Sequence, residues 1–239
     1  MRKSFFLTLL LTLCCTLTAW AEAYSPQAGD YIMLKNRKYG TWLSASNLWY
    51  VFGVTATTTD IEPELIWELQ ATDITDAYKL YNKKSYKYVG TIPTDQTAAI
   101  LSLWSEDSEN AGKYKFTTFT DTEGNYTTLY GYNPDVNDGN KYMYHTDWQD
   151  KMIIRGSNED KASHWTITEV CPINITYGDN GTPEIETFVK SGTTYTIDNQ
   201  GKTIKSCIVN GQPIEANNGV WSVVVTEATT IYVTFEEVV

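Results

Sequence analysis

One short segment of the sequence combines side chains suited to binding a flat molecule rich in hydroxyl groups. It follows Met143 and carries two aromatic rings, an imidazole, a carboxylate and an amide, on Tyr144, Trp148, His145, Asp147 and Gln149. The two aromatic rings could stack on the C–H face of a pyranose, while the carboxylate and the amide would meet its hydroxyl groups. The alternative interpretation is a hairpin with one tucked aromatic ring and solvated polar side chains.

Two further groups of residues extend this candidate binding site. Asn133 and Asp135 lie in an Asp/Asn-rich stretch before it, and Asn47 and Trp49 occupy a comparable place earlier in the chain. Asp135 also opens an Asp-x-Asn-Asp-Gly run, in which oxygen ligands alternate as in calcium loops. Its glycine comes one place too late for an EF-hand loop, so we favour an ordinary Asx turn. We therefore expect neither a metal nor another cofactor.

Catalytic motifs are absent from the sequence. Its two histidines, His145 and His164, are accompanied neither by a nucleophile elbow nor by a metal-binding spacing. No glycine-rich phosphate loop occurs. Carboxylates such as Glu62 and Glu64 cannot be assigned as a glycosidase pair without geometry. We therefore expect a binding protein rather than an enzyme.

A threefold internal repeat sets the positions of these residues. Each copy opens with an apolar segment that ends in asparagine, and each closes with an aromatic-x-apolar triplet. The opening segments are 32–36, 78–82 and 129–133, and a short apolar pair follows each of them at 42–43, 88–89 and 142–143. A further apolar run comes next at 50–52, 100–103 and 152–154, and the closing triplets are 67–69, 114–116 and 165–167. Apolar–polar alternation predicts strands, and the Asn, Asp and Gly residues between them predict turns.

Three copies of four short strands indicate an all-β domain over residues 24–170. No apolar pattern with the period of a helix and a useful length follows the first residues of the chain. The strand count is that of a closed barrel capped by hairpins, and closure removes the exposed edges of a sheet.

The repeat resembles that of the ricin-type β-trefoil lectins. The likeness is carried by the Tyr-x-Leu-x-Asn segment at 78–82 with Tyr88-Val89 after it, and by the Gly-Asn-Lys-Tyr-Met run at 139–143. It implies a β-trefoil over residues 22–170 and carbohydrate as the class of ligand. The sugar-contacting residues of the family are not retained, because its acidic position is taken by Ser44, Gly90 and Tyr144.

Residues 171–239 differ in character from the repeats. Alternating apolar runs at 195–197, 204–209, 221–225 and 231–235 are separated by Asn/Gly turns, which predicts a small β-sandwich. The stretch resembles the immunoglobulin-like modules of bacterial surface and secreted proteins, which implies a spacer or a partner-binding role. Cys171 and Cys207 could form one disulfide in an oxidising compartment or remain two buried thiols.

Residues 1–21 have the pattern of a signal peptide. Arg2 and Lys3 precede an apolar run, and Ala19-Trp20-Ala21 fits a cleavage site. We expect a processed chain of residues 22–239 that is secreted, periplasmic or held at the cell surface. Lipidation of Cys14 or Cys15 is the alternative. No later stretch is long enough to span a bilayer, so we expect no membrane insertion.

The net charge of the chain limits the classes of partner that it can bind. It has 29 acidic and 18 basic residues and a net charge of −11, and removal of Arg2 and Lys3 would leave −13. Such a surface repels phosphate backbones and anionic headgroups, which argues against nucleic acid and membrane surfaces. We expect a secreted, non-catalytic protein that binds glycans or glycoproteins. The alternative is a protein–protein module, such as an adhesin, a protease inhibitor or a subunit of a surface assembly.

Overall fold

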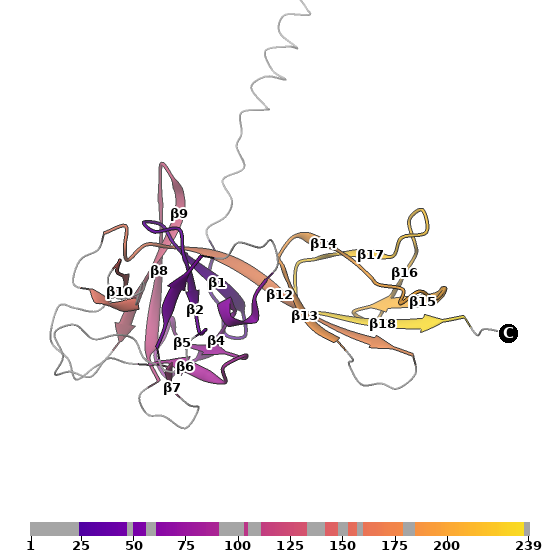
Figure 1. The fold of residues 1–239 in the computed structure, drawn as a ribbon, viewed down its shortest axis with the longest axis horizontal. Helices are drawn as coiled ribbons and strands as arrows, with labels where there is room; N and C mark the ends of the chain where they lie inside the picture. The colour runs from indigo at the N-terminus through magenta and orange to yellow at the C-terminus, as the bar shows by residue number, and fades with distance from the viewer. Residues whose placement is uncertain are drawn as a thin grey trace, which may run out of the picture.

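The structure is a computed structural model that describes residues 24–46, 50–55, 61–90, 103–104, 111–132, 142–147, 153–156, 160–178 and 185–236. Within these residues every regular element is a strand, apart from one 3-10 turn, η1 (Pro63–Leu65). None of them forms a helix long and apolar enough to cross a membrane. Figure 1 shows two β-rich parts joined by the long strand β12 (Trp165–Tyr177). The prediction of an all-β chain is confirmed.

The described strands of the first part fall into three groups of four, one for each repeat. The first repeat forms β1 (Tyr31–Asn36), β2 (Trp42–Ser44), β3 (Phe52–Val54) and β4 (Trp67–Ala71). The second forms β5 (Ala77–Asn82), β6 (Lys87–Val89), β7 (Leu103–Trp104) and β8 (Lys113–Asp121). The third forms β9 (Gly124–Tyr132), β10 (Tyr142–His145), β11 (Ile153–Gly156) and the start of β12. Each of these strands overlaps an apolar segment that the repeat pattern predicts.

Six of these strands close a barrel. Going round it, β1 pairs with β4, β4 with β5, β5 with β8, β8 with β9, β9 with β12, and β12 with β1 again, always antiparallel. The closing pair is long, because its register runs from Tyr31 opposite Val170 to Asn36 opposite Trp165. A closed ring has no free sheet edge, which was the physical reason for expecting a barrel.

The other strands of the repeats form three hairpins, β2–β3, β6–β7 and β10–β11. The first strand of each hairpin also pairs with a barrel strand: β2 with β1, β6 with β5, and β10 with β9. A six-stranded barrel capped by three hairpins is a β-trefoil, so the predicted fold of this part is confirmed.

The closing aromatic residue of each repeat is buried in the trefoil core and needs a hydrogen-bond partner there. Each ring donates to a backbone carbonyl at the second strand of its own repeat: Trp67 Nε1 to Leu43 (3.2 Å), the Tyr114 hydroxyl to Gly90 (2.7 Å) and Trp165 Nε1 to Met143 (3.1 Å). The tyrosine of the second copy therefore replaces tryptophan without leaving a buried donor unpaired.

The second part begins inside β12 rather than after it. Its further strands are β13 (Ile185–Lys190), β14 (Thr193–Thr196), β15 (Ile204–Val209), β16 (Gln212–Ile214), β17 (Ser222–Val225) and β18 (Thr229–Phe235). One sheet has the order β13-β12-β18-β15-β16, and β14 pairs with β17 in a second sheet. The apolar runs predicted β14, β15, β17 and β18, whereas β13 and β16 are additional. The immunoglobulin-like identity of this part stays a prediction.

The boundary expected between residues 170 and 171 therefore lies within one continuous strand. The first half of β12 pairs with β1 of the barrel, and its second half pairs with β13 and, in parallel, with β18. Met33, Leu65, Ile66 and Val170 are buried together at this junction, and Phe188 of β13 packs against them. We call this apolar contact between the two parts the seam.

The structure decides between the two states left open for the cysteines. Cys171 and Cys207 are both free and buried, so no disulfide joins them. Cys207 on β15 lies opposite Val233 on β18, and Val233 in turn lies opposite Tyr177 on β12. Tyr177 is six residues along β12 from Cys171. Six residues of strand span about 20 Å. A disulfide needs Cα atoms within about 7 Å, so this pairing would require the sheet to be rebuilt.

Candidate functional site

The site proposed from sequence is centred on strand β10, and the structure describes part of it. Along β10 the side chains alternate, with Met143 and His145 buried and Tyr142 and Tyr144 partly exposed. Asp147 lies exposed just beyond the end of the strand. The remaining predicted site residues lie outside the described part of the chain: Trp148, Gln149, Asn133, Asp135, Asn47 and Trp49.

His145 is fully buried and joins the third repeat to the first. Its Nε2 lies 2.6 Å from the Thr41 hydroxyl, and its ring stacks on Tyr39 with centroids 4.5 Å apart and planes inclined by 27°. Its backbone N–H donates to the carbonyl of Ala162 at 3.0 Å. Gly53 of β3 makes room for the imidazole, since a Cβ there would run into Nε2. His145 therefore supports the site from beneath, whereas its sequence position had suggested contact with a ligand.

In the described part of the chain, four side chains form the partly exposed surface beside His145. The Tyr144 hydroxyl donates to Asp160 Oδ2 at 3.2 Å, and Lys38 Nζ lies 5.2 Å from the centroid of the Tyr39 ring. Burial, and then the nearby Asp160 carboxylate, raise the pKa of Tyr144. A hydrogen bond to Tyr39 raises the pKa of Lys38, with smaller contributions from Tyr144 and Asp160. We call Lys38, Tyr39, Tyr144 and Asp160 the tyrosine patch.

A buried asparagine positions the first-repeat half of this patch. Asn36 ends β1, and its Oδ1 accepts the backbone N–H groups of Lys38 (3.1 Å) and Tyr39 (3.2 Å). Its Nδ2 donates to the Ala162 carbonyl at 2.8 Å, the same carbonyl that accepts from the His145 backbone. One side chain thus fixes the turn that carries Tyr39 and ties it to the loop behind His145. Asn82, which ends β5 in the second repeat, likewise accepts from the backbone of the turn that follows it, at Ser85 (2.9 Å).

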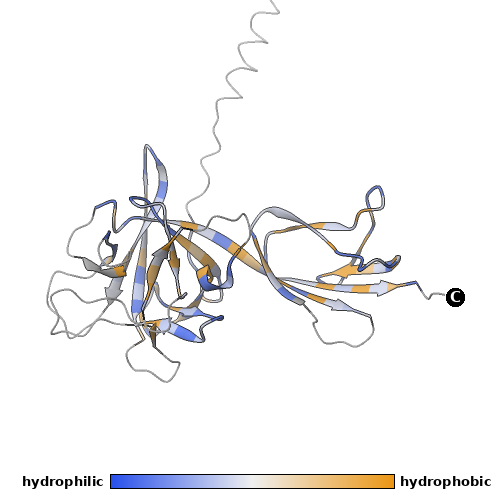
Figure 2. Cartoon of the chain, in the orientation of Figure 1, coloured by the Kyte–Doolittle hydropathy of each residue, from blue (hydrophilic) through white to orange (hydrophobic). Residues whose placement is uncertain are grey.

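Arg37, the residue before the patch, anchors the same turn from its other side. Its guanidinium makes two hydrogen bonds to Asp121, at 2.9 and 3.0 Å, and lies 4.8 Å from the centroid of the Tyr126 ring. The ion pair raises the pKa of Arg37 and lowers that of Asp121. Asp121 lies near the tip of the β8–β9 hairpin, which projects beyond the barrel and is hydrophilic at its tip (Figure 2). The turn is therefore held by charge-assisted bonds on the side away from the tyrosine patch.

The sequence pointed to the third-repeat residues of this surface and not to its first-repeat residues. It predicted Tyr144, His145 and Asp147 in the third repeat, and the structure places these on or next to β10. It missed Lys38 and Tyr39, which reach the same surface from the first repeat. The available signal was the turn after the repeated asparagine, where a tyrosine and a lysine stand together. Closure of the barrel between β12 and β1 brings these distant segments side by side.

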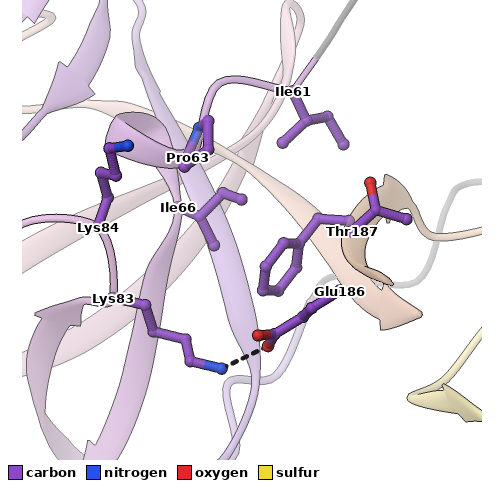
Figure 3. A pocket seen from close by; sticks show the side chains of 8 residues that line it. Ile61, Pro63, Ile66, Lys83, Lys84, Glu186 and Thr187 are labelled. Atoms are coloured by element: carbon purple, nitrogen blue, oxygen red, sulfur yellow. Dashed lines mark hydrogen bonds and ion pairs between the residues drawn. The ribbon is translucent and has the colours of Figure 1, made fainter. Parts of the chain in front are cut away.

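A second hollow lies at the seam between the two parts and has a volume of about 230 Å³. Figure 3 shows Ile61, Pro63 and Ile66 on its trefoil side and Glu186 on its β13 side, with Lys83 bonded to Glu186. That ion pair has an N–O distance of 2.7 Å and spans the hollow. The hollow is thus crossed by a contact that holds the two parts together, which makes it a weaker binding candidate than the tyrosine patch.

Metal chemistry has no support in the described part of the chain, where no group of three or more His, Cys, Asp or Glu side chains is arranged to hold an ion. The Asp/Asn-rich run that hints at calcium lies outside the described residues. The tyrosine patch offers two hydroxyls, one carboxylate and one ammonium group beside aromatic faces.

Comparisons with known proteins concern the fold alone. No protein-family model matches the chain, and no curated protein sequence matches it. Among solved structures, the chain is similar to the Macrolepiota procera ricin B-like lectin in complex with lactose, with 16% identity over 60% of this chain and 98% of that one and a TM-score of 0.45. The Polyporus squamosus lectin, bound to a human-type influenza-binding epitope, has 12% identity over 62% of this chain and 52% of its own and a TM-score of 0.47. A designed threefold-symmetric protein, ThreeFoil, has 16% identity over 57% of this chain and 96% of its own, with a TM-score of 0.44.

Proposed function

We propose that this chain is a secreted, non-catalytic glycan-binding protein and that the tyrosine patch is its binding site. The observation that carries the proposal is the stack of Tyr39 on the buried His145, with Tyr144 bonded to Asp160 beside it. An aromatic ring that is backed by the core can receive the C–H face of a pyranose at little cost in side-chain entropy, once the exposed Lys38 side chain moves from over the ring to a sugar hydroxyl.

The polar groups of the patch suit the hydroxyl groups of a sugar. Lys38 donates and is exposed, Asp160 accepts, and the Tyr144 hydroxyl can do both. A sugar hydroxyl is itself both donor and acceptor, so it can be inserted between such groups. We further propose that Asp147, Trp148 and Gln149 extend the site beyond the end of β10, as their sequence positions suggest.

The test is a glycan array probed with the processed chain, residues 22–239, in parallel with three variants. Tyr144→Ala and Tyr39→Ala remove a ring from the patch, and we expect each to weaken binding at least tenfold. Tyr86→Ala is the matched control, because Tyr86 is a 73% exposed tyrosine on the β5–β6 turn, outside the patch. Binding that survives both patch variants, or a blank array with folded protein, would refute the proposal.

A second candidate function is protein binding through the second part. Ile208 and Tyr232 lie opposite each other on β15 and β18 and are 37% and 42% exposed. Apolar side chains exposed side by side on a sheet could form the centre of a contact surface for another protein. If an extracellular protein is captured through this surface, Tyr232→Lys should abolish capture and Tyr86→Lys should leave it intact. Equal capture by both variants would remove this candidate.

A further inference from the structure

The end of the second part that lies away from the trefoil contains an open groove of about 640 Å³. It lies where β14 ends, β15 begins and the chain enters β17, and Trp221 lines it. Ile204 opens β15 opposite Phe235, the last residue of β18. Because β18 runs parallel to β12 and away from the barrel, this places the groove at the far end of the molecule (Figure 1).

The floor of the groove is apolar and rigid. Ile197 and Ile204 belong to the buried core of the second part, and Trp221 is partly buried against the same core. The Trp221 carbonyl accepts the backbone N–H of Ile197 at 2.9 Å, which ties β17 to the end of β14. The indole is therefore held in place by main chain and core together. Next to it Val220 is 49% exposed.

The rim of the groove is polar and carries balanced charge. Asp198 and Asn199 each use Oδ1 to accept a backbone N–H of the following turn, at 2.9 and 3.0 Å. Within the described residues, Asp198 Oδ2 and the Asn199 amide nitrogen make no hydrogen bond, so both can serve a ligand. Lys202 lies over Phe235, with Nζ 4.9 Å from the ring centroid. The rim thus offers one carboxylate, one ammonium group and one amide, with no net charge.

We infer that this groove is a second glycan site, specific for neutral pyranose rings. An indole with an aliphatic floor suits the apolar face of a sugar, and the rim pairs acceptors with donors as hydroxyl groups require. The volume lies within the range of about 300–1,000 Å³ typical of small-ligand sites. Balanced rim charge in an acidic chain argues against phosphorylated, sulfated or carboxylated ligands, because these need a surplus of cationic groups.

A site in this position would make the chain divalent. The tyrosine patch and the groove lie on different parts, and β12 alone extends over about 40 Å between them. Two sites on one chain can engage two sugars of a glycan-bearing surface, or bridge two surfaces. Such double attachment strengthens binding by about 10²–10⁴-fold over either site when the geometry allows both contacts.

The test follows the indole N–H signal of Trp221 in nitrogen-15 NMR spectra of the processed chain, with the signal assigned from Trp221→Phe. The probes are lactose, cellobiose, mannobiose and chitobiose at millimolar concentration. We expect at least one of these neutral disaccharides to shift the Trp221 signal with saturation. Val220→Arg, which places a charged side chain at the mouth of the groove, should weaken that response at least tenfold.

Val224→Arg is the matched control, because Val224 lies on β17, is 59% exposed and does not line the groove. It should leave the Trp221 response unchanged. A Trp221 signal that none of the disaccharides moves, or a response that Val220→Arg leaves intact, would overturn the inference.

The inference does not rest on the proposed function of the tyrosine patch, and the two can fail separately. If disaccharides shift the Trp221 signal in Tyr39→Ala as well, and the patch variants do not change binding on the glycan array, the groove is a glycan site and the tyrosine patch is not. If array binding depends on Tyr39 and Tyr144 and no disaccharide shifts the Trp221 signal, the tyrosine patch is a glycan site and the groove is not.

Discussion

At the scale of single residues, Gly53 determines whether the tyrosine patch can form. A methyl group at this position would meet His145 Nε2 and would lie 2.7 Å from the Thr41 hydroxyl. Both partners are buried and hydrogen-bonded to each other, so neither can move without loss. Tyr39 stacks on the same imidazole and would have to follow any shift of it.

We therefore expect Gly53→Ala to lower the free energy of unfolding by about 1–3 kcal/mol, the usual cost of overpacking a core. Urea unfolding of the processed chain measures it, and the glycan array should show weakened binding by the same variant. A double-mutant cycle with His145→Ala checks the cause, since removal of the ring removes the closest contacts of the added methyl group and leaves only the one with Thr41. An equal cost of Gly53→Ala in both backgrounds would contradict this account.

Cys207 provides a second prediction at the residue scale, from its pKa. Burial among the apolar residues of the second part raises the pKa of its thiol to about 11. Because the thiolate is the reactive form, the folded chain should hardly react with a thiol reagent at pH 8, whereas the unfolded processed chain should react at both Cys171 and Cys207. Fast labelling of folded protein would show that this core opens or is less buried than the structure indicates.

The same shift makes stability depend on pH in the alkaline range. An unfolded thiol with a pKa near the reference value of 9.0 loses its proton earlier than the folded one. Between about pH 9 and pH 11, ionisation of the thiol therefore stabilises the unfolded state more than the folded state. The free energy of unfolding falls as the pH rises through this range. Below pH 9 the Cys207 thiol is protonated in both states, and its contribution to the free energy of unfolding is fully present. The slope of stability against pH in this window should be shallower in Cys207→Val.

At the scale of elements, the two parts are joined by apolar packing more than by charge. Lys83 and Glu186 form an ion pair whose side chains are 42% and 49% exposed, and such surface pairs contribute only about 0–1 kcal/mol. Phe188 packs into the seam and meets the Tyr31 ring with centroids 5.2 Å apart. Lys83 lies near both rings, at 5.5 and 6.0 Å from their centroids.

We expect Phe188→Ala to lower the free energy of unfolding by about 1–3 kcal/mol, because the Phe188 ring is partly buried in the seam and its removal would leave the seam incompletely filled. Glu186→Ala should cost less than about 1 kcal/mol in 0.15 M salt. Urea unfolding of the two variants compares them directly. A larger loss from Glu186→Ala would mean that electrostatics, rather than packing, holds the parts together.

The elements also show how far sequence reasoning could reach. Period-two alternation and the repeated Asn, Trp and Tyr positions predicted the trefoil strands, since both signals are local. Strand β13 was missed, because its Ile-Glu-Thr-Phe-Val-Lys sequence has no clear alternation of apolar and polar residues. Tyr39 was missed for a different reason: its place beside Tyr144 depends on barrel closure, which joins residues more than a hundred positions apart.

At the scale of the whole molecule, one strand serves two cores. The first half of β12 contributes Trp165 to the trefoil core, and its second half contributes Ile173 and Ile175 to the core of the second part. Val170 lies between them in the seam. Domains joined by a flexible linker move independently by default. Here the connection is a strand with ladder partners along its whole length, so the two parts should behave as one body.

This arrangement predicts that the processed chain unfolds in one cooperative step. If the second part unfolded first, β12 would lose its pairing with β13 and β18, and the seam would lose Phe188. The barrel would then carry an exposed apolar surface beside its own closing strand. The loss of these contacts penalises any state in which only one part is folded, and that penalty is the physical source of cooperativity.

Hydrogen exchange measured by mass spectrometry against urea concentration tests this coupling. Peptides from the barrel strands β1 and β4 and from β15 and β18 should lose protection at the same midpoint. Val225→Ala, which truncates a fully buried side chain in the second part, should lower both midpoints together. If instead the peptides of residues 185–236 lost protection first while the barrel kept its midpoint, the seam would be too weak to couple the parts, and the two glycan sites proposed here would sit on bodies free to reorient.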